Sequence, residues 1–240
     1  MYYEQADYDI RLEWGEKGVE VLAPSSDVVV IVDVLSFTTC VEIALARGST
    51  VFPFAGPPEA AQHLAQEQRA MLATKRGMPG AAYTLSPASL LTIPQGARVV
   101  LPSPNGSTLS LAAARHTTVV AACLRTSAAV ARYVQNRFQR ITIIPCGERW
   151  WPQGSLRPCL EDLVGAGAIV SALQGKKSPE ALQAELLCRA LADLPATIAA
   201  CVSGVELREQ GYEEDVRLAS AVNVGECVPL LDGGRYVRVS

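Results

Sequence analysis

Apolar runs that end in short polar clusters recur along the chain and set its predicted architecture. Four such junctions read VVVIVDVLSFTT, VVLPSPNGST, VVAACLRTS and ITIIPCGERW. The first run, from Val28 to Val34, is rich in β-branched residues and is broken only by Asp33, which predicts a strand buried on both faces of a parallel sheet. Because ligands bind outside the carboxyl ends of such strands, we expect polar residues of the four junctions to face one cleft. They are Asp33, Asn105, Arg125 and Glu148.

Strands and helices alternate up to about residue 150. Strands are predicted over 28–34, 50–54, 98–101, 117–123 and 141–145, with helices over 38–47, 107–115 and 126–138 and another that opens at 57–58. Residues 73–94 are rich in glycine, proline and small side chains, and they are predicted to form a long loop or lid. The alternation predicts an α/β fold in which a mostly parallel sheet is layered with helices.

The pattern changes after Trp150, where helices predominate. We predict helices over 161–173, from 179, over 203–210 and over 215–222, followed by a hairpin across residues 232–234. The fold is therefore expected to have a helix-rich C-terminal part. A single domain over 1–240 is expected, and two lobes, about 1–150 and 151–240, are the alternative.

Composition and charge narrow the range of partners. The 240 residues are 49% hydrophobic, and 21 basic against 24 acidic residues leave a net charge of −3 without a basic run, so no nucleic-acid partner is expected. No segment approaches about 18 uninterrupted apolar residues, and the start lacks a signal-peptide pattern, so we expect a cytoplasmic protein without a membrane partner. Seven scattered cysteines and two distant histidines predict neither a disulfide framework nor a zinc site.

Asp33 places a carboxylate within an apolar strand. Burying an unpaired charge there is costly, so the side chain needs a partner or a metal. One interpretation is a cap on the following helix, for which Ser36, Thr38 and Thr39 compete. The other is a ligand for a hard cation, or a general base, at the edge of the sheet.

Two polar turns are candidate anion sites. In SPNGST, the residues Asn105, Gly106 and Ser107 open a helix whose free N–H groups favour a phosphate, although Asn-Gly is also common in plain turns. The segment Arg125-Thr126-Ser127 repeats this arrangement. It adds a guanidinium that suits two-point contact with phosphate, carboxylate or sulfonate oxygens.

Further carboxylates follow a strand or open helices. Glu148 ends one junction, Glu161 and Asp162 open a helix, and Asp215 closes an acidic run that begins at residue 213. For the last three, ordinary dipole partners in a first helical turn or solvated charges are the alternative interpretations. Together with Asp33, these oxygen donors and the scarcity of histidine indicate Mg²⁺ rather than zinc.

These residues lie in motifs that resemble the ComB family of magnesium-dependent 2-phosphosulfolactate phosphatases. The resemblance covers most of the chain through VVIVDVLSFTT, SPNGS, PCGERW with LEDLVGAGA, and YEEDVRLASAVNVGECVPLL, in that order. It implies a ComB-like fold and hydrolysis of a phosphate ester on a short sulfonated acid, a step associated with coenzyme M biosynthesis. Two departures alter the expected anion-binding groups: Ser36 stands where the family pattern has arginine, and TKRGM over 74–78 replaces a GERGG-like loop.

The predicted function is Mg²⁺-dependent hydrolysis of a small phosphorylated acid with release of inorganic phosphate. Asp33, Glu148 and Asp162 are predicted to hold Mg²⁺ or to orient the attacking water, and Glu161 and Asp215 are further candidate metal ligands. The predicted substrate-binding residues are Ser36, Arg76, Asn105, Gly106, Ser107 and Arg125.

Other functions are compatible with these residues. A cysteine hydrolase of isochorismatase-like type would use Asp33 with Cys146, whose thiol would need a depressed pKa. A catalytically degenerate relative would bind the anion without turnover. A covalent route through Asp33 is less favoured than direct attack by water, because Leu35 stands where DxD phosphatases have their second aspartate. No signature sets the oligomeric state, and a homodimer is compatible with the sequence.

Overall fold

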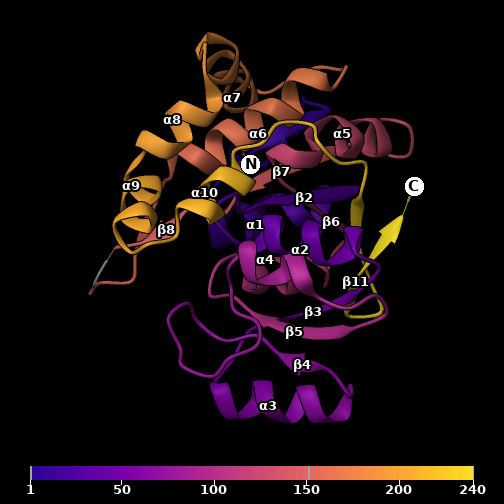
Figure 1. Cartoon of the computed structure of the whole chain (residues 1–240). Coiled ribbons are helices and arrows are strands. Elements are labelled where there is room, and N and C mark those ends of the chain that lie inside the picture. The colour runs from indigo at the N-terminus through magenta and orange to yellow at the C-terminus, as the bar shows by residue number, and fades with distance from the viewer. Residues whose placement is uncertain (1, 151, 240) are drawn as a thin grey trace.

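A mostly parallel sheet of nine strands runs through the computed structural model, which describes residues 2–150 and 152–239 (Figure 1). The strands are β1 (Ile10–Leu12), β2 (Val28–Val32), β3 (Thr50–Phe54), β4 (Met71–Leu72), β5 (Arg98–Pro102), β6 (Thr118–Ala122), β7 (Ile141–Pro145), β10 (Val228–Asp232) and β11 (Arg235–Val239). Their order in the sheet is β1-β7-β2-β6-β10-β11-β3-β5-β4. A separate small hairpin pairs β8 (Glu148–Arg149) with β9 (Leu156–Arg157). The predicted α/β fold class is confirmed.

The C-terminal hairpin lies inside the large sheet. It turns at Gly233 and Gly234, whose φ values of 53° and 79° fit the tight turn that requires positive φ at both central positions. β10 pairs antiparallel with β6, and β11 pairs antiparallel with β3. The hairpin therefore joins two parallel blocks, β1-β7-β2-β6 and β3-β5-β4. The sequence predicts the hairpin, but it does not predict this central place.

Helices cover the sheet and dominate the later part of the chain. They are α1 (Gly15–Leu22), α2 (Phe37–Ala46), α3 (Pro58–Glu67), α4 (Gly106–Ala113), α5 (Ser127–Gln135), α6 (Leu160–Ala172), α7 (Pro179–Ala190), α8 (Leu194–Ala200), α9 (Val202–Glu209) and α10 (Glu213–Ala219). The group α6 to α10 confirms the predicted helix-rich C-terminal part and occupies the top and the left side of Figure 1. The sequence does not predict β1, α1 or α8, which are too short to show a clear period.

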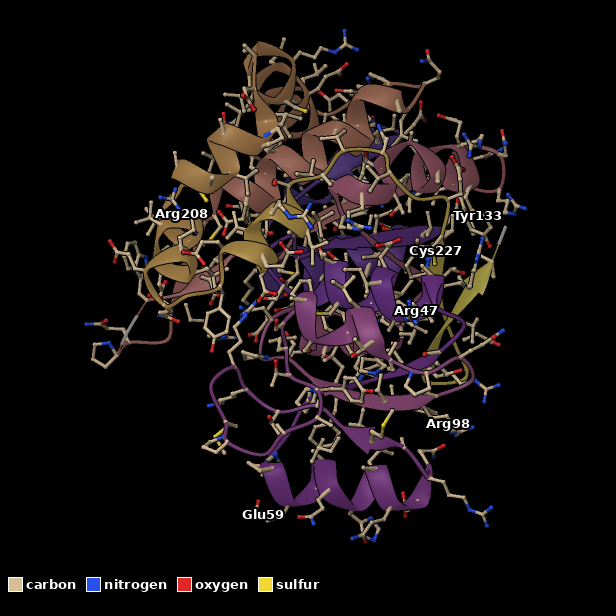
Figure 2. The ribbon with its side chains drawn as sticks, in the orientation of Figure 1. Arg47, Glu59, Arg98, Tyr133, Arg208 and Cys227 are labelled. Carbon is tan, nitrogen blue, oxygen red and sulfur yellow. The ribbon has the colours of Figure 1, made fainter. Side chains whose placement is uncertain are left out.

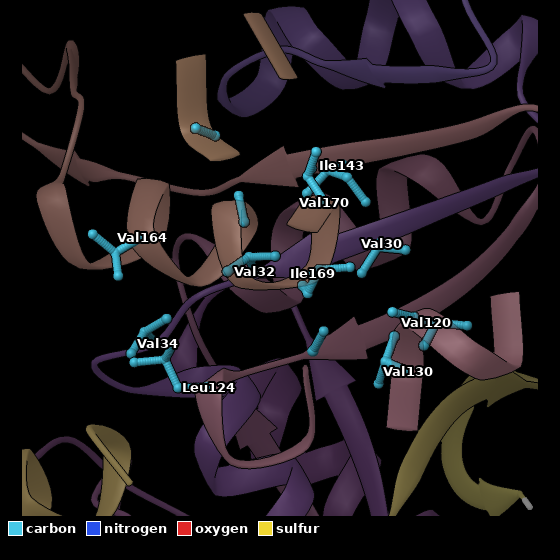
Figure 3. Packing of buried hydrophobic residues seen from close by; sticks show 14 of the residues in the cluster. Val30, Val32, Val34, Val120, Leu124, Val130, Ile143, Val164, Ile169 and Val170 are labelled. Atoms are coloured by element: carbon cyan, nitrogen blue, oxygen red, sulfur yellow. The ribbon is translucent and has the colours of Figure 1, made fainter. Parts of the chain in front are cut away.

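β2 is buried on both faces, as the sequence predicts. Val28, Val30 and Val32 pack in a cluster with residues of α5 and α6 (Figure 3). Val29 and Ile31 point to the other face and pack with residues of α1 and α4. Burial of such side chains contributes about 1.5–3 kcal/mol each. The strand that carries Asp33 at its carboxyl end is therefore firmly fixed.

The part of the chain after residue 150 shares the sheet with the part before it, because β10 and β11 pair with β6 and β3. The expected single domain, like the alternative of two lobes, stays a prediction. Residues 73–94 form the expected loop, apart from a short 3₁₀ helix, Ala88–Thr92.

Charged side chains such as Glu59 and Arg208 extend from the outer surface (Figure 2). Arg98 instead lies over the ring of Phe52, with its guanidinium carbon 4.9 Å from the ring centre. Among the described residues, no helix is both long enough and apolar enough to cross a membrane.

The contact between α6 and α7 depends on Gly167. A Cβ at this position would lie 2.1 Å from the backbone oxygen of Ala184, and no side-chain rotation relieves such a clash. We expect Gly167→Ala to lower the free energy of unfolding by about 1–3 kcal/mol, because overpacking outweighs the gain in helix propensity. Urea denaturation measures this change.

Ser171→Ala in the same helix is the matched control. It removes a buried hydroxyl that has no hydrogen-bond partner among the described residues, so stability should stay equal or rise. A Gly167→Ala protein as stable as the wild type would contradict the close approach of the two helices.

Candidate active site

Three of the four polar junctions meet at one edge of the sheet. The turn after β2 carries Asp33, the turn after β5 carries Asn105 and Gly106, and the turn after β7 carries Glu148. Oδ2 of Asp33 accepts a hydrogen bond of 3.1 Å from the backbone N–H of Gly106. The side-chain amide of Asn105 donates to Oε2 of Glu148, also at 3.1 Å. The predicted cleft therefore joins these three turns, although β5 lies in the other parallel block.

Asp33 binds the amino ends of two helices. Its Oδ1 accepts hydrogen bonds from the N–H groups of Ser36 at 2.8 Å and Phe37 at 3.1 Å, which open α2. Its Oδ2 binds the N–H of Gly106, the first residue of α4. The helix-cap interpretation is thus observed, and it extends to a second helix. The sequence predicts that the N–H groups at the start of α4 bind a phosphate. In the structure, the N–H of Gly106 donates to the carboxylate of Asp33 instead.

Negative charge is concentrated around Asp33. Burial raises the pKa of Asp33 to about 6, the N–H of Ser36 opposes this shift, and the charge of Glu148 adds to it. Burial, followed by the charges of Asp33 and Glu161, raises the pKa of Asp162 well above its ordinary value. Carboxylates with raised pKa values in a desolvated cluster suit a general base or a cation site.

Asp162 connects the ends of two neighbouring strands. It lies in the first turn of α6 and is only 4% exposed. Its Oδ1 accepts a hydrogen bond from the N–H of Val34 and its Oδ2 from the N–H of Gly147, both at 2.8 Å. Val34 follows β2 and Gly147 follows β7, so one carboxylate holds the Asp33 turn beside the Glu148 turn.

Two glycines allow this close arrangement. A Cβ on Gly106 would lie 2.2 Å from Cδ1 of Phe37, so the starts of α2 and α4 could not approach each other. Gly147 has a φ of 67°, and a Cβ there would lie 2.8 Å from the backbone oxygen of Arg157. Gly106 is therefore needed for packing, and Gly147 for packing and for its positive φ.

A pocket of about 230 Å³ opens beside the Asn105–Glu148 hydrogen bond. Asn105 is 8% exposed, whereas Glu148 is exposed. Cys146 also contributes to the lining, and the charges of both Asp33 and Glu148 act on its thiol. The pocket is therefore adjacent to the carboxylate cluster.

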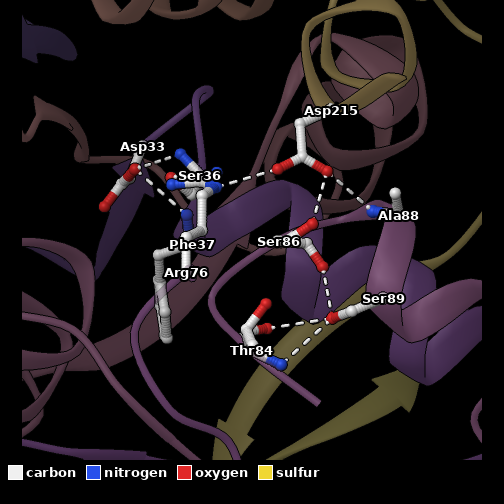
Figure 4. A network of polar contacts seen from close by, with 9 residues as sticks. All are labelled: Asp33, Ser36, Phe37, Arg76, Thr84, Ser86, Ala88, Ser89 and Asp215. Carbon is white, nitrogen blue, oxygen red and sulfur yellow. Dashed lines mark hydrogen bonds and ion pairs between the residues drawn. The ribbon is translucent and has the colours of Figure 1, made fainter. Parts of the chain in front are cut away.

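Arg76 reaches the Asp33 turn from the long loop (Figure 4). Its Nη2 donates to Oγ of Ser36 at 2.9 Å, and its Nε donates to Oδ2 of Asp215 at 2.8 Å. Asp215 is 2% exposed and also accepts hydrogen bonds from Ser86 Oγ and the N–H of Ala88. Asp215 thereby fixes residues 73–94 against α10 and positions Arg76.

The other candidates have partners outside this group. Arg125 pairs with the buried Glu42 at 2.6 Å and donates to the backbone oxygen of Leu218. Glu161 is buried and accepts a hydrogen bond from the Cys201 thiol. The Ser107 hydroxyl is fully buried and donates to the backbone oxygen of Leu101. All three side chains thus have partners within the protein.

Comparison with known proteins identifies the family of this chain. The family model described as 2-phosphosulpholactate phosphatase matches residues 19–234. The chain belongs to the 2-phosphosulpholactate phosphatase family. A probable 2-phosphosulfolactate phosphatase of Carboxydothermus hydrogenoformans is 29% identical over 218 residues, covering 87% of this chain and 89% of that protein. A probable 2-phosphosulfolactate phosphatase of Pseudothermotoga lettingae is 28% identical over 216 residues, covering 88% and 92%. The resemblance to the ComB family is confirmed.

The oxygen donors of this family member are compatible with Mg²⁺. Within residues 2–150 and 152–239, no group of three or more His, Cys, Asp or Glu side chains is arranged as a metal site. Mg²⁺ differs from zinc in keeping several waters, and it is usually bound by one or two carboxylates together with substrate phosphate. Asp33 and Glu148, whose charges interact, match this smaller kind of donor set in number and chemistry.

The cysteine-hydrolase alternative is not supported by the thiol of Cys146. Burial, followed by the charges of Asp33, Asp162 and Glu148, raises the pKa of this thiol well above its ordinary value. A nucleophilic cysteine needs the opposite shift. The family match and the surroundings of Cys146 therefore both favour a phosphatase.

Some residues around the pocket could not be found from the sequence pattern. Trp14 and Glu16 line it from the start of α1, and Leu156 lines it from β9. α1 has only two turns, and β9 has only two residues. The one sequence feature that points to this pocket is the Gly147-Glu148-Arg149 segment, which follows β7 at this edge of the sheet.

The raised pKa of Asp33 predicts a pH-dependent stability in metal-free protein. Its folded pKa of about 6 exceeds the ordinary value of 3.8, so the folded state binds this proton more tightly than the unfolded chain. The stability of the wild type relative to Asp33→Asn should therefore rise as the pH falls from about 6 to about 4. Urea unfolding at several pH values, with chelator present, measures this difference. A difference in unfolding free energy between the two proteins that does not change with pH would contradict the raised pKa.

Proposed function

We propose that the protein is a Mg²⁺-dependent phosphomonoester hydrolase that acts on a small anionic substrate. 2-Phosphosulfolactate or a related phosphorylated 2-hydroxy acid is the proposed substrate. Family membership supports the reaction class. The observation that carries the proposal is Asp33, a carboxylate with a pKa of about 6 beside Glu148 and a small pocket.

Asp33 has one oxygen that remains available for chemistry. Oδ1 accepts two backbone N–H groups, whereas Oδ2 accepts one and keeps a free lone pair. With a pKa near 6, Asp33 is mostly ionised at neutral pH, so Oδ2 could hold a cation or accept a proton from the attacking water.

The remaining residues position the reactants. Asp33 and Glu148 would hold Mg²⁺, which supplies charge neutralisation at the phosphate and Lewis-acid chemistry when bound. Asp162 keeps their two turns together through Val34 and Gly147. Asn105 orients Glu148, and Gly106 orients Asp33. Their contribution is therefore mainly geometric.

The size of the pocket supports a small substrate. Its volume is about 230 Å³, below the range of about 300–1,000 Å³ typical of pockets for larger ligands. Ser36 and Arg76, which contact each other beside Asp33, are proposed to face the phosphate. A role in coenzyme M synthesis, a cytoplasmic location and a homodimer stay predictions.

Release of inorganic phosphate tests the reaction class. We expect turnover that requires Mg²⁺ and stops with chelator, on a panel of phosphosulfolactate, phospholactate, phosphoglycerate and an aryl phosphate. The ranking of the first three compares sulfonate with carboxylate recognition. Tight binding of these compounds without phosphate release would instead favour a catalytically degenerate anion-binding protein.

Asp33→Asn should lower kcat/KM at least about 100-fold, because an amide neither accepts the proton nor balances a cation. Circular dichroism and a cooperative unfolding transition verify that the variant folds. Asp193→Asn is the matched control, since Asp193 also caps a helix but is exposed on α8. It should keep wild-type turnover. Wild-type rates in folded Asp33→Asn would exclude Asp33 from catalysis.

A further inference from the structure

The pocket beside Glu148 has a second wall that the proposed chemistry does not use. This wall is formed by the start of α1, with Trp14 and Glu16, and by the β8–β9 hairpin, with Arg149 and Leu156. The two parts lie next to each other, because a Cβ on Gly15 would be at ordinary contact distance, 3.4 Å, from the Leu156 side chain. The wall therefore runs from α1 to the hairpin.

Arg149 connects the two parts of this wall. Its Nη2 donates to Oε1 of Glu16 at 2.7 Å, and its Nη1 donates to the backbone oxygen of Gly154 at 3.2 Å. Glu16 and Gly154 both line the pocket. The guanidinium therefore lies at the pocket, one residue along the chain from Glu148.

The partner of Arg149 distinguishes it from two other candidate arginines. Arg76 pairs with Asp215 and Arg125 pairs with Glu42, and both of these carboxylates are only 2% exposed. Separating such a pair leaves a buried charge unpaired, which is strongly unfavourable. Glu16 is 61% exposed and Arg149 42% exposed, so their pair contributes little and can exchange partners.

We propose that this pocket binds the part of the substrate farthest from the phosphate, and that Arg149 exchanges Glu16 for a carboxylate or sulfonate of the substrate. The proposal rests on the phosphatase function proposed above and assigns its specificity to a residue not among those predicted from the sequence. Water then replaces Arg149 as the partner of Glu16, at little cost because Glu16 is exposed. The carbon chain of the substrate packs against the apolar surfaces of Trp14 and Leu156.

Kinetics on three substrates test this assignment. Phospholactate carries a carboxylate, the phosphate ester of isethionate carries a sulfonate, and ethyl phosphate carries neither. Arg149→Gln should lower kcat/KM for the first two by about 10-fold or more, mainly through KM, and leave ethyl phosphate within about 2-fold. Glu16→Gln should raise kcat/KM for the two anionic substrates, because it frees the guanidinium. The ratio between phospholactate and the isethionate ester shows which group Arg149 prefers.

Arg132→Gln is the matched control. Arg132 forms a still more exposed pair with Glu226 on another part of the surface, and its loss changes the net charge by the same amount. It should leave all three substrates unchanged. Equal loss on all three substrates in Arg149→Gln, or no loss on any, would overturn the assignment while leaving phosphatase activity established.

A binding measurement separates this proposal from the phosphatase proposal. Isothermal titration with lactate and isethionate requires no turnover. Weaker binding to Arg149→Gln than to the wild type would support the subsite, even if no phosphate ester were hydrolysed. Equal binding to both proteins, or binding to neither, would overturn it.

Discussion

The arrangement of the site depends on the carboxylate of Asp162. β2 and β7 are neighbours in the sheet, but the chain leaves them in different directions, toward α2 and toward the β8–β9 hairpin. Asp162 holds both turns through the N–H groups of Val34 and Gly147. Leaving such a buried group without its partner costs about 1–3 kcal/mol. The carboxylate is itself anchored by α6, whose small residues pack against β2 and α7. The helix-rich C-terminal part therefore supports chemistry at strands far earlier in the chain.

Asp33 determines how a phosphate could be held. In many α/β proteins, free N–H groups at a helix start bind the phosphate directly. Here the starts of α2 and α4 both bind Asp33, so the same groups stabilise a protein carboxylate. An incoming phosphate would then meet a negative charge, which the proposed Mg²⁺ would neutralise. This geometry gives the proposed metal dependence a physical reason that does not depend on resemblance to other proteins.

The sequence predicts most of the strands and the residues at their ends, because these depend on local hydrophobic patterns and on the common edge of a parallel sheet. It does not predict the partners of long polar side chains. Arg125 pairs with Glu42 and Arg76 pairs with Asp215, and the partners of each pair are far apart in the chain. No rule of sequence spacing could therefore predict these ion pairs. Short elements such as α1 and β9 also carry too little pattern to predict. What the sequence does not predict therefore depends on tertiary contacts. These contacts include those that form the second wall of the pocket.

Ser36 links the long loop to the Asp33 turn. Its N–H binds Asp33, while its hydroxyl accepts a hydrogen bond from Arg76. Arg76 is in turn fixed by Asp215 and lies over the ring of Tyr212, with its guanidinium carbon 5.5 Å from the ring centre. A displacement of residues 73–94 would therefore act on the turn that holds the carboxylate of Asp33. Arg76, with a buried partner, contributes a fixed positive charge on one side of Asp33, and Arg149, with an exposed partner, contributes an exchangeable one. A substrate with an anionic group at each end would match these two positive charges.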